Sequence, residues 1–189
     1  AKFAEPTTTT STFIGAPYGK SNSATANYSF ITDNIINKSD APLMIYTYSE
    51  VLFARAEAAA KTWTTEDASS LYEQAITASM EQWGVDAADI TTYITANPYT
   101  GIEDVAYEKY VSLFLQGYNS WAEWRRFKAE GNDGKINLVA PADLLSNATD
   151  IPQRDGYSAT AKALNEDNYN SAVSAQGADT LDTILWIFK

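Results

Sequence analysis

The sequence has no cysteine and no histidine among its 189 residues. Without them the chain cannot build a zinc site from thiolate or imidazole ligands, a cysteine nucleophile or a histidine-dependent catalytic triad. Any hydrolytic chemistry would have to depend on carboxylate, lysine, serine or tyrosine side chains. The sequence therefore predicts a protein with no metal site and no cofactor.

Basic residues and long apolar runs are also scarce. The chain has 13 Lys and Arg residues against 24 Asp and Glu residues, so its net charge is −11 at pH 7. Nucleic-acid binding and attachment to an anionic membrane both need a basic surface, so we expect no nucleic-acid partner and no such attachment. No apolar run reaches the roughly 18 residues of a membrane-spanning helix.

Aromatic residues are abundant, with 5 Trp, 12 Tyr and 7 Phe, and hydrophobic residues make up 45% of the chain. This composition predicts a globular protein, in which aromatic rings fill the core or stack on sugar rings. Residues 1–40 are rich in Thr, Ser and Asn, which predicts an irregular or extended segment. Residues 41–189 carry helical patterns and are predicted to form one domain or a part of a larger one.

Two helices joined by a short loop are predicted first. Apolar and alanine residues predict a helix over about 41–61, and Thr64 with Asp67 resembles a capping box that opens a second helix over about 65–83. Gly84 is predicted to end this second helix. A short connection makes the pair an antiparallel hairpin, and small alanines at the crossing are typical of tetratricopeptide-like helix pairs. The predicted fold class is therefore mainly α.

Further helices are predicted along the rest of the chain. A short helix is expected over about 87–96, and the longest one over about 103–128. Gly117 in the middle of the longest helix costs about 1 kcal/mol relative to alanine, which predicts close packing there. A last helix is predicted over about 159–175. The apolar tail at 181–189 is expected to pack against other parts of the protein.

Four segments of the sequence form an ordered set. Residues 48–58 read Tyr-Ser-Glu-Val-Leu-Phe-Ala-Arg-Ala-Glu-Ala, and residues 72–84 run from Tyr-Glu-Gln-Ala to Gln-Trp-Gly. Residues 110–126 end in Trp-Ala-Glu-Trp-Arg-Arg, and residues 151–169 begin with Ile-Pro-Gln-Arg and end in Asn-Tyr. In content, order and spacing these segments resemble the SusD/RagB-type family of outer-membrane nutrient-binding lipoproteins. The resemblance is strongest to the subgroup described as starch-binding and associating with the outer membrane.

The resemblance implies a SusD-like, mainly α fold and a binding function without catalysis. Members of the family are lipid-anchored on the outer face of the outer membrane in Bacteroidetes-type bacteria, through an N-terminal cysteine that this chain does not contain. They cover a SusC-like TonB-dependent transporter and hand it oligosaccharides, or in some cases peptides. Family members are longer, so the resemblance implies that this chain is a C-terminal portion. Its Leu-Trp-Ile-Phe end at 185–188 departs from the Trp-Trp-Asp that is usual in the family.

Two other functions stay open from the residues alone. A glycosidase needs two carboxylates about 5 to 9.5 Å apart, and the candidates are Glu103 with Asp104, or Asp86 with Asp89. All four residues stand where a helix is predicted to begin, so helix capping explains them without catalysis. The other alternative is a structural tetratricopeptide-like module that binds a protein partner and no glycan.

The candidate ligand-binding residues are Trp63, Trp83, Tyr93, Asn97 and Tyr99. They fall at predicted helix ends or in loops, where an aromatic face can be exposed and an amide can bind sugar hydroxyls. Packing of the turns is the alternative role for these rings.

Charged residues on the predicted helices are expected to form ion pairs between helices and to complement the helix dipole. They are Glu50, Arg55 and Glu57 on the first helix and Arg125 and Arg126 at the end of the longest one.

Overall fold

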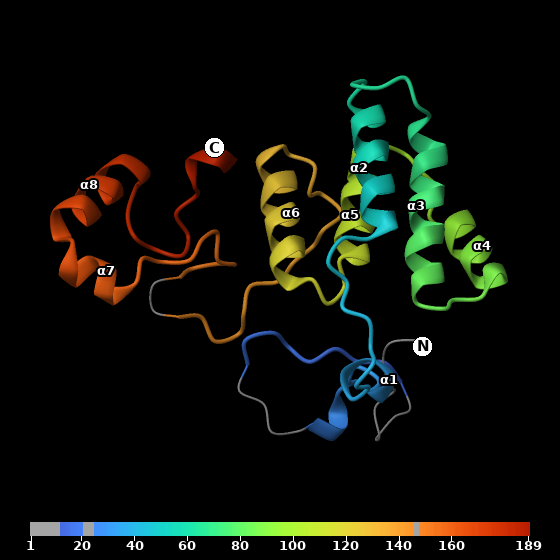
Figure 1. Cartoon of the computed structure of the whole chain (residues 1–189), viewed down its shortest axis with the longest axis horizontal. Coiled ribbons are helices and arrows are strands. Elements are labelled where there is room, and N and C mark those ends of the chain that lie inside the picture. Colours follow the sequence, from blue (N-terminus) through green and yellow to red (C-terminus); the bar gives the residue numbers. More distant parts are fainter. Residues whose placement is uncertain (1–11, 21–24, 146–147) are drawn as a thin grey trace. The chain divides into compact units, whose positions relative to one another are not determined.

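The computed structural model describes residues 12–20, 25–145 and 148–189, and these are mainly helical (Figure 1), which confirms the predicted fold class. The described residues contain no β-strand. The helices are α1 (Asp33–Ile36), α2 (Tyr48–Ala60), α3 (Ala68–Gln82), α4 (Ala87–Ala96), α5 (Ile102–Ser112), α6 (Gly117–Ala129), α7 (Ala159–Leu164) and α8 (Glu166–Gln176), with 3-10 turns η1 (Thr25–Asn27) and η2 (Trp186–Phe188).

The chain divides into two compact units. Among the described residues, the first unit comprises 12–15 and 26–137 and holds α1 to α6, and the second comprises 16–20, 25, 138–145 and 148–189 and holds α7 and α8. Within the predicted irregular segment, residues 1–11 and 21–24 lie outside the described residues, and the described remainder contains only η1 and α1. No described helix is long and apolar enough to cross a membrane.

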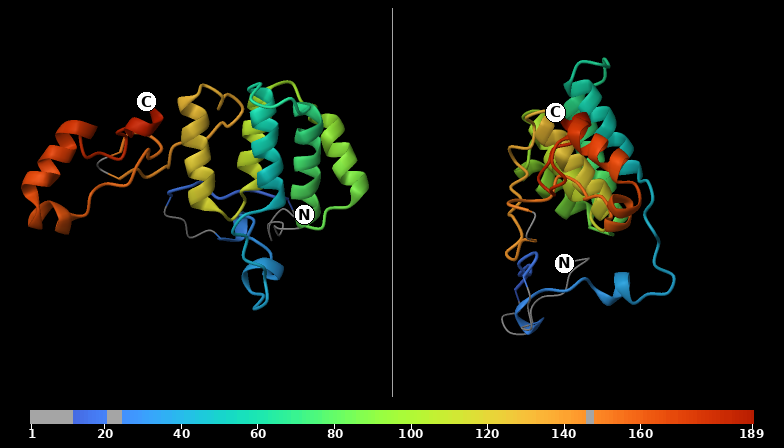
Figure 2. Two further views of the ribbon diagram at one scale, coloured as in Figure 1. Left: turned by 45° about the horizontal axis from the view of Figure 1, so that its top comes forward. Right: turned by 90° about the vertical axis from the view of Figure 1, so that its left-hand side faces the viewer.

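The predicted hairpin is formed by α2 and α3, which run antiparallel and side by side (Figures 1 and 2). Helix α2 begins at Tyr48, so the expected start near residue 41 is wrong. Thr47 ends the preceding irregular stretch because it forms a capping box: its hydroxyl accepts from the Glu50 N–H at 3.3 Å, and Glu50 accepts from the Thr47 N–H at 3.4 Å. This exchange satisfies two backbone donors that would otherwise lack partners at a helix start.

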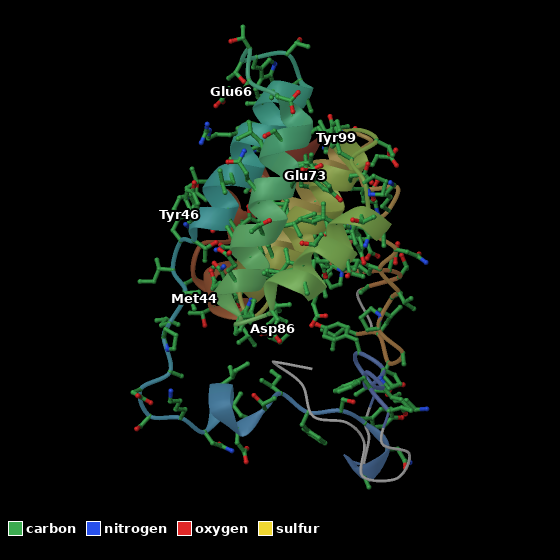
Figure 3. The ribbon with its side chains drawn as sticks, turned by 90° about the vertical axis from the view of Figure 1, so that its right-hand side faces the viewer. Met44, Tyr46, Glu66, Glu73, Asp86 and Tyr99 are labelled. Atoms are coloured by element: carbon green, nitrogen blue, oxygen red, sulfur yellow. The ribbon has the colours of Figure 1, made fainter. Side chains whose placement is uncertain are left out.

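The predicted capping role of Thr64 is wrong, because Asp67 alone opens α3. The Asp67 carboxylate accepts from the backbone N–H of Ser70 at 2.6 Å. At its other end α3 stops as predicted, with Gly84 in the left-handed region at a φ of 68°. Figure 3 shows Glu66 near the loop end of the hairpin and Asp86 beyond the opposite end of α3.

The core of the first unit lies between α2, α3 and α5. Ala56 on α2 and Ala75 on α3 are both fully buried in it, so small side chains occupy the interior of the hairpin as predicted. Large side chains surround them, and each buried Leu, Ile or Phe contributes about 1.5–3 kcal/mol relative to an exposed one. The buried members of this core are Leu52, Phe53, Ala56, Ala59, Leu71, Tyr72, Ala75, Ile76 and Val105.

The predicted longest helix is in fact two helices, α5 and α6, which contact each other. Leu115 stands between them with a φ of 68°, a left-handed conformation that interrupts the helical hydrogen bonds. Gly117 is the first residue of α6 and not a mid-helix residue. A Cβ atom added to Gly117 would meet no other atom within 4 Å, so the predicted close packing there is also wrong.

The second unit contains α7 and α8 in place of the single helix predicted over about 159–175. Asn165 separates them, with a φ of −146° and a ψ of 54° that no helix continues through. The tail after α8 is partly exposed: Trp186 has 74% and Ile187 has 63% of its surface accessible. The start of the tail does pack as expected, because the Leu181 carbonyl accepts from the Gln153 and Arg154 N–H groups and Asp182 accepts from Thr149, whereas Trp186 and Ile187 stay exposed.

Candidate functional site

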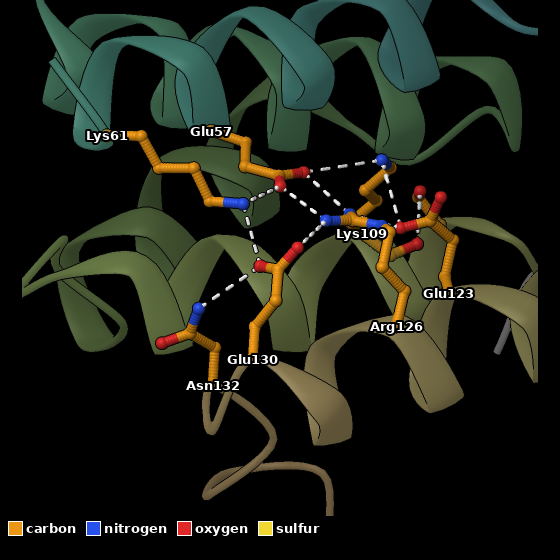
Figure 4. A network of polar contacts seen from close by, with 8 residues as sticks. Glu57, Lys61, Lys109, Glu123, Arg126, Glu130 and Asn132 are labelled. Atoms are coloured by element: carbon orange, nitrogen blue, oxygen red, sulfur yellow. Dashed lines mark hydrogen bonds and ion pairs between the residues drawn. The ribbon is translucent and has the colours of Figure 1, made fainter. Parts of the chain in front are cut away.

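A buried set of charged side chains joins three helices of the first unit (Figure 4). Glu57 on α2 is 7% exposed and forms a two-pronged ion pair with Arg126 on α6, with N–O distances of 2.5 and 2.7 Å. Lys61 donates to the same carboxylate at 2.9 Å, and the Lys109 ammonium on α5 lies 3.6 Å from it. Glu57 therefore connects α2 to both α5 and α6.

Two further carboxylates balance the charge of this cluster. Glu123 lies 2.6 Å from Arg126 and 3.1 Å from Lys109, and Glu130 lies 2.7 Å from Lys61. Burial alone would raise the pKa of Glu57, but the hydrogen bonds from Arg126 and Lys61 and the neighbouring positive charges outweigh it and lower that pKa to about 2. The group is thus an ionised, structural cluster.

The predicted pairing of charges between helices is confirmed for Glu57 and Arg126. The other residues have local roles: Glu50 caps α2, Arg55 pairs with Glu66 in the adjoining loop, and Arg125 stacks on the Trp121 ring at 3.7 Å.

An apolar cavity of about 530 Å³ lies between α3, α5 and the turn that leads into α6. Trp83 and Phe114 meet in its wall edge to face, with ring centroids 5.6 Å apart. Only a few polar side chains reach it, so the cavity can desolvate an apolar group but offers few hydrogen bonds. Its lining residues are Phe53, Ile76, Ser79, Met80, Trp83, Val85, Tyr93, Glu108, Tyr110, Val111, Leu113, Phe114, Leu115, Gly117 and Ser120.

A second cavity, of about 430 Å³, has a more polar wall. We call it the polar cavity. It lies where the loop between α4 and α5 meets α5 and the segment that follows α6. Its lining residues are Tyr72, Ala96, Asn97, Pro98, Thr100, Asp104, Tyr107, Glu108 and Lys135.

Glu108 on α5 lines both cavities. Its carboxyl accepts a hydrogen bond from the Tyr93 hydroxyl at 2.8 Å. Burial raises the pKa of Glu108, and the Asp104 charge adds to the rise, while the hydrogen bond from Tyr93 opposes it without cancelling it. Burial and the same carboxylate also raise the pKa of Tyr93.

Asp104 lies in the first turn of α5 and lines the polar cavity. Its carboxylate accepts from the Thr100 N–H and hydroxyl, both at 2.6 Å, and from the Gly101 N–H at 3.1 Å. It also pairs with Lys135. Burial would raise the pKa of Asp104, but the bonds from Lys135 and Thr100 lower it below its usual range. Asp104 was one of the candidate carboxylates for a glycosidase, with helix capping as the other explanation. Its hydrogen bonds to Thr100 and Gly101 show that it caps α5.

The predicted ligand-binding residues do not form one group. Trp83 and Tyr93 line the apolar cavity, and Asn97 lines the polar one. Tyr99 packs against the Tyr72 ring at a centroid distance of 5.7 Å and lines neither cavity. Trp63 is 74% exposed in the hairpin loop, with the Lys61 ammonium 4.9 Å from its ring.

Tyr107 and Lys135 are among the lining residues of the polar cavity that were not predicted as ligand-binding residues. Tyr107 belongs to the apolar stripe of α5 by its spacing, which indicates a core position, yet it is 38% exposed. Lys135 lies 31 residues from its partner Asp104, so no local pattern connects them. Within the described residues no group of three or more acidic side chains is arranged to hold a metal ion.

The sequence of this chain matches one protein family over most of its length. Residues 1–158 match the SusD-like family model, which is described as starch-binding associating with outer membrane. The chain therefore belongs to this SusD-like family, as its four ordered segments predicted. No curated protein sequence matches the chain.

Solved structures share the fold of the chain. A SusD-like protein from Bacteroidetes is 28% identical with a TM-score of 0.71, and the match covers 84% of this chain and 32% of that protein. A SusD homologue from Bacteroides fragilis is 22% identical with a TM-score of 0.74, over 100% of this chain and 48% of the homologue. A chitin-binding protein is 21% identical with a TM-score of 0.68, over 86% of this chain and 37% of that protein. The chain thus spans less than half the length of these similar proteins.

Proposed function

We propose that the protein carrying this chain captures oligosaccharides at the outer membrane without catalysis and hands them to a SusC-like TonB-dependent transporter. The observation that carries the proposal is the family match over residues 1–158. The fold likeness to SusD homologues and to a chitin-binding protein supports it. In this proposal the protein is lipid-anchored and faces outward, through a cysteine that the present chain does not contain.

The placement of the carboxylates supports a function without catalysis. With no histidine or cysteine in the chain, carboxylates are the main candidates for acid–base work. Glu57 is held by three basic residues, and Asp104 is held by Lys135 and by the backbone at the start of α5. Groups held in this way stabilise the fold and are poorly placed to take up or release a proton during a reaction.

Binding and co-purification together test the proposal. Oligosaccharides of several neutral types would be titrated against the protein by calorimetry, and a tagged form would be isolated from native outer membranes. We expect binding to at least one oligosaccharide without its cleavage, together with recovery of a TonB-dependent transporter. Binding to no oligosaccharide, and no transporter in the isolate, would refute the proposal.

A carboxylate-dependent glycosidase is the second candidate, and one observation favours it. Glu108 is a buried carboxyl with a raised pKa at a cavity, as a general acid requires, and Asp104 lies in the same cavity wall. Product analysis by chromatography after long incubation tests this candidate. Cleavage that is lost in Glu108→Gln would establish it in place of the non-catalytic proposal.

A further inference from the structure

The two cavities differ in what they can offer to a sugar. A sugar ring carries a hydroxyl group on most of its carbons, and each hydroxyl that is desolvated without a new partner costs about 1–3 kcal/mol. The apolar cavity is lined mainly by hydrocarbon and aromatic groups, so it would leave most hydroxyls unpaired. The polar cavity has amide, hydroxyl, carboxylate and ammonium groups in its wall and avoids this cost.

The polar groups of this cavity are held in place by the protein. The side-chain NH2 group of Asn97 donates to the backbone carbonyl of Tyr93 at 2.9 Å, and the backbone carbonyl of Asn97 accepts from the Tyr72 hydroxyl at 3.0 Å. The side-chain oxygen of Asn97 stays available as an acceptor. Lys135 pairs with Asp104, but its side chain is 43% exposed, and an ammonium group has three donors. Donors and acceptors for hydroxyl groups are therefore fixed before a ligand arrives.

Tyr107 adds an aromatic surface to the same cavity. It lies on α5, it is 38% exposed, and its hydroxyl has no hydrogen-bond partner within the described part of the chain. A partly exposed ring with a free hydroxyl provides both an apolar face for the C–H side of a sugar and a polar group at its edge.

The charge of the cavity selects among sugars. Asp104 and Lys135 neutralise each other, and Glu108 adds a second carboxyl to the wall. The cavity therefore has no excess positive charge with which to bind the carboxylate of an acidic sugar, and the chain as a whole is strongly acidic. A neutral sugar is the ligand that meets no repulsion here.

We propose that the polar cavity is a subsite for one neutral sugar unit, in which Tyr107 stacks on the ring and Asn97 and Lys135 bind its hydroxyls. This inference rests on the proposed function, because it assigns a part of the captured oligosaccharide to this chain.

Calorimetric titration with maltoheptaose and chitohexaose as neutral probes, and with an oligogalacturonide as an acidic one, tests the subsite. We expect Tyr107→Ala and Asn97→Ala each to weaken binding of a neutral probe about tenfold or more. Tyr118→Ala is the matched control, because Tyr118 is an exposed tyrosine of the same unit, 81% accessible, that lines neither cavity. The affinity of Tyr118→Ala for the neutral probe should equal that of the unaltered protein.

The outcomes separate the subsite from the proposed function. If the unaltered protein binds a neutral probe and Tyr107→Ala binds it equally well, the subsite is wrong while oligosaccharide capture stands. Tighter binding of the acidic probe than of either neutral probe would also overturn the subsite. If the unaltered protein binds none of the probes, the subsite proposal is wrong, whereas oligosaccharide capture fails only if the isolate from outer membranes also lacks a transporter. Thermal melting of each variant shows whether a loss of binding comes from unfolding.

Discussion

Glu57 is the residue at which three helices of the first unit meet. Its carboxylate is almost completely buried and pairs with Arg126 on α6, Lys109 on α5 and Lys61, the residue directly after its own helix. A buried ion pair is weak evidence of net stability compared with an apolar substitute, but removal of one partner leaves the other charges buried without compensation. The stability of this junction therefore depends on Glu57 more than on any exposed pair.

Glu57→Gln is expected to lower the free energy of unfolding by about 3 kcal/mol, because it leaves buried positive charge unbalanced. Urea denaturation at pH 7 measures this loss. Glu66→Gln is the control, since it breaks the exposed pair with Arg55 and should leave the unfolding midpoint nearly unchanged. Equal effects of the two substitutions would contradict the central role of Glu57.

The lowered pKa of Glu57 also predicts how stability depends on pH. The pKa falls from 4.5 to about 2 in the folded state, so the folded state holds this proton less tightly than the unfolded state. The ionised Glu57 carboxylate therefore adds about 3 kcal/mol to the free energy of unfolding above pH 4.5, and this contribution is lost as the pH falls toward 2. Denaturation measured between pH 5 and 2 should show that the free energy of unfolding depends less on pH in Glu57→Gln than in the unaltered protein. Identical pH dependence in both proteins would show that another group is responsible.

At the scale of elements, the hairpin helices end in the same motif with different residues. After α2, Thr62 N–H bonds to the Ala59 carbonyl and Trp63 N–H to that of Ala58, both at 2.9 Å. After α3, Gly84 and Val85 bond in the same pattern to the two corresponding carbonyls. This is the Schellman motif, whose central residue adopts a left-handed conformation that glycine tolerates and a β-branched residue resists.

Two substitutions in this motif should have opposite effects. Thr62→Gly removes a side chain from a φ of 59° and is expected to stabilise the protein by about 1 kcal/mol, while Gly84→Ala at a φ of 68° is expected to destabilise it by about 1 kcal/mol. Thermal melting followed by circular dichroism measures both changes. A loss of stability in Thr62→Gly would mean that the hydrogen bond from the Thr62 hydroxyl to the Lys61 carbonyl matters more than the backbone conformation.

The break between α5 and α6 shows where helix prediction fails. The residues from 102 to 129 carry one continuous apolar pattern, and no proline interrupts it. The chain turns at Leu115, which has an unfavourable left-handed backbone and partly lines the apolar cavity. Packing against other helices can supply the roughly 1–2 kcal/mol that such a conformation costs, and a local pattern carries no information about that packing.

At the scale of the whole molecule, each of the two units contains its own buried ion pair. In the second unit Arg154 is 5% exposed and lies 3.2 Å from Asp179, which also accepts hydrogen bonds from the Tyr157 N–H and the Tyr169 hydroxyl. These contacts join the loop before α7 to α8 and to the segment after it. Asp179 thus has in the second unit the connecting role that Glu57 has in the first.

Arg154→Met is expected to raise amide hydrogen exchange across residues 148–189 while α2 and α3 keep their protection. The substitution leaves the largely buried Asp179 carboxylate without its cation, and proteins open locally in cooperative units. Exchange measured by mass spectrometry resolves the two regions. A uniform rise over the whole chain would show that the units open together, and the prediction would then be wrong.

Much of the fold and little of the candidate site could be predicted from local sequence. The bounds of α4 and the end of α3 at Gly84 agree with the sequence patterns, because capping and turn chemistry act within a few residues. Trp83 and Asn97 lie at helix ends as predicted and Tyr93 lies inside α4, but the three side chains line two different cavities. Which cavity a side chain lines depends on helices that are distant in sequence.

The sequence by itself determined the family, the mainly α fold and the exclusion of histidine and cysteine chemistry, since these depend on composition and on ordered local segments. Only the tertiary structure decided which charges pair and which side chains share a cavity. Glu57 and Arg126 are 69 residues apart, and Asp104 and Lys135 are 31 residues apart. Such pairs form because packing of the helices brings them together out of water, and that packing is a property of the whole unit and not of any segment.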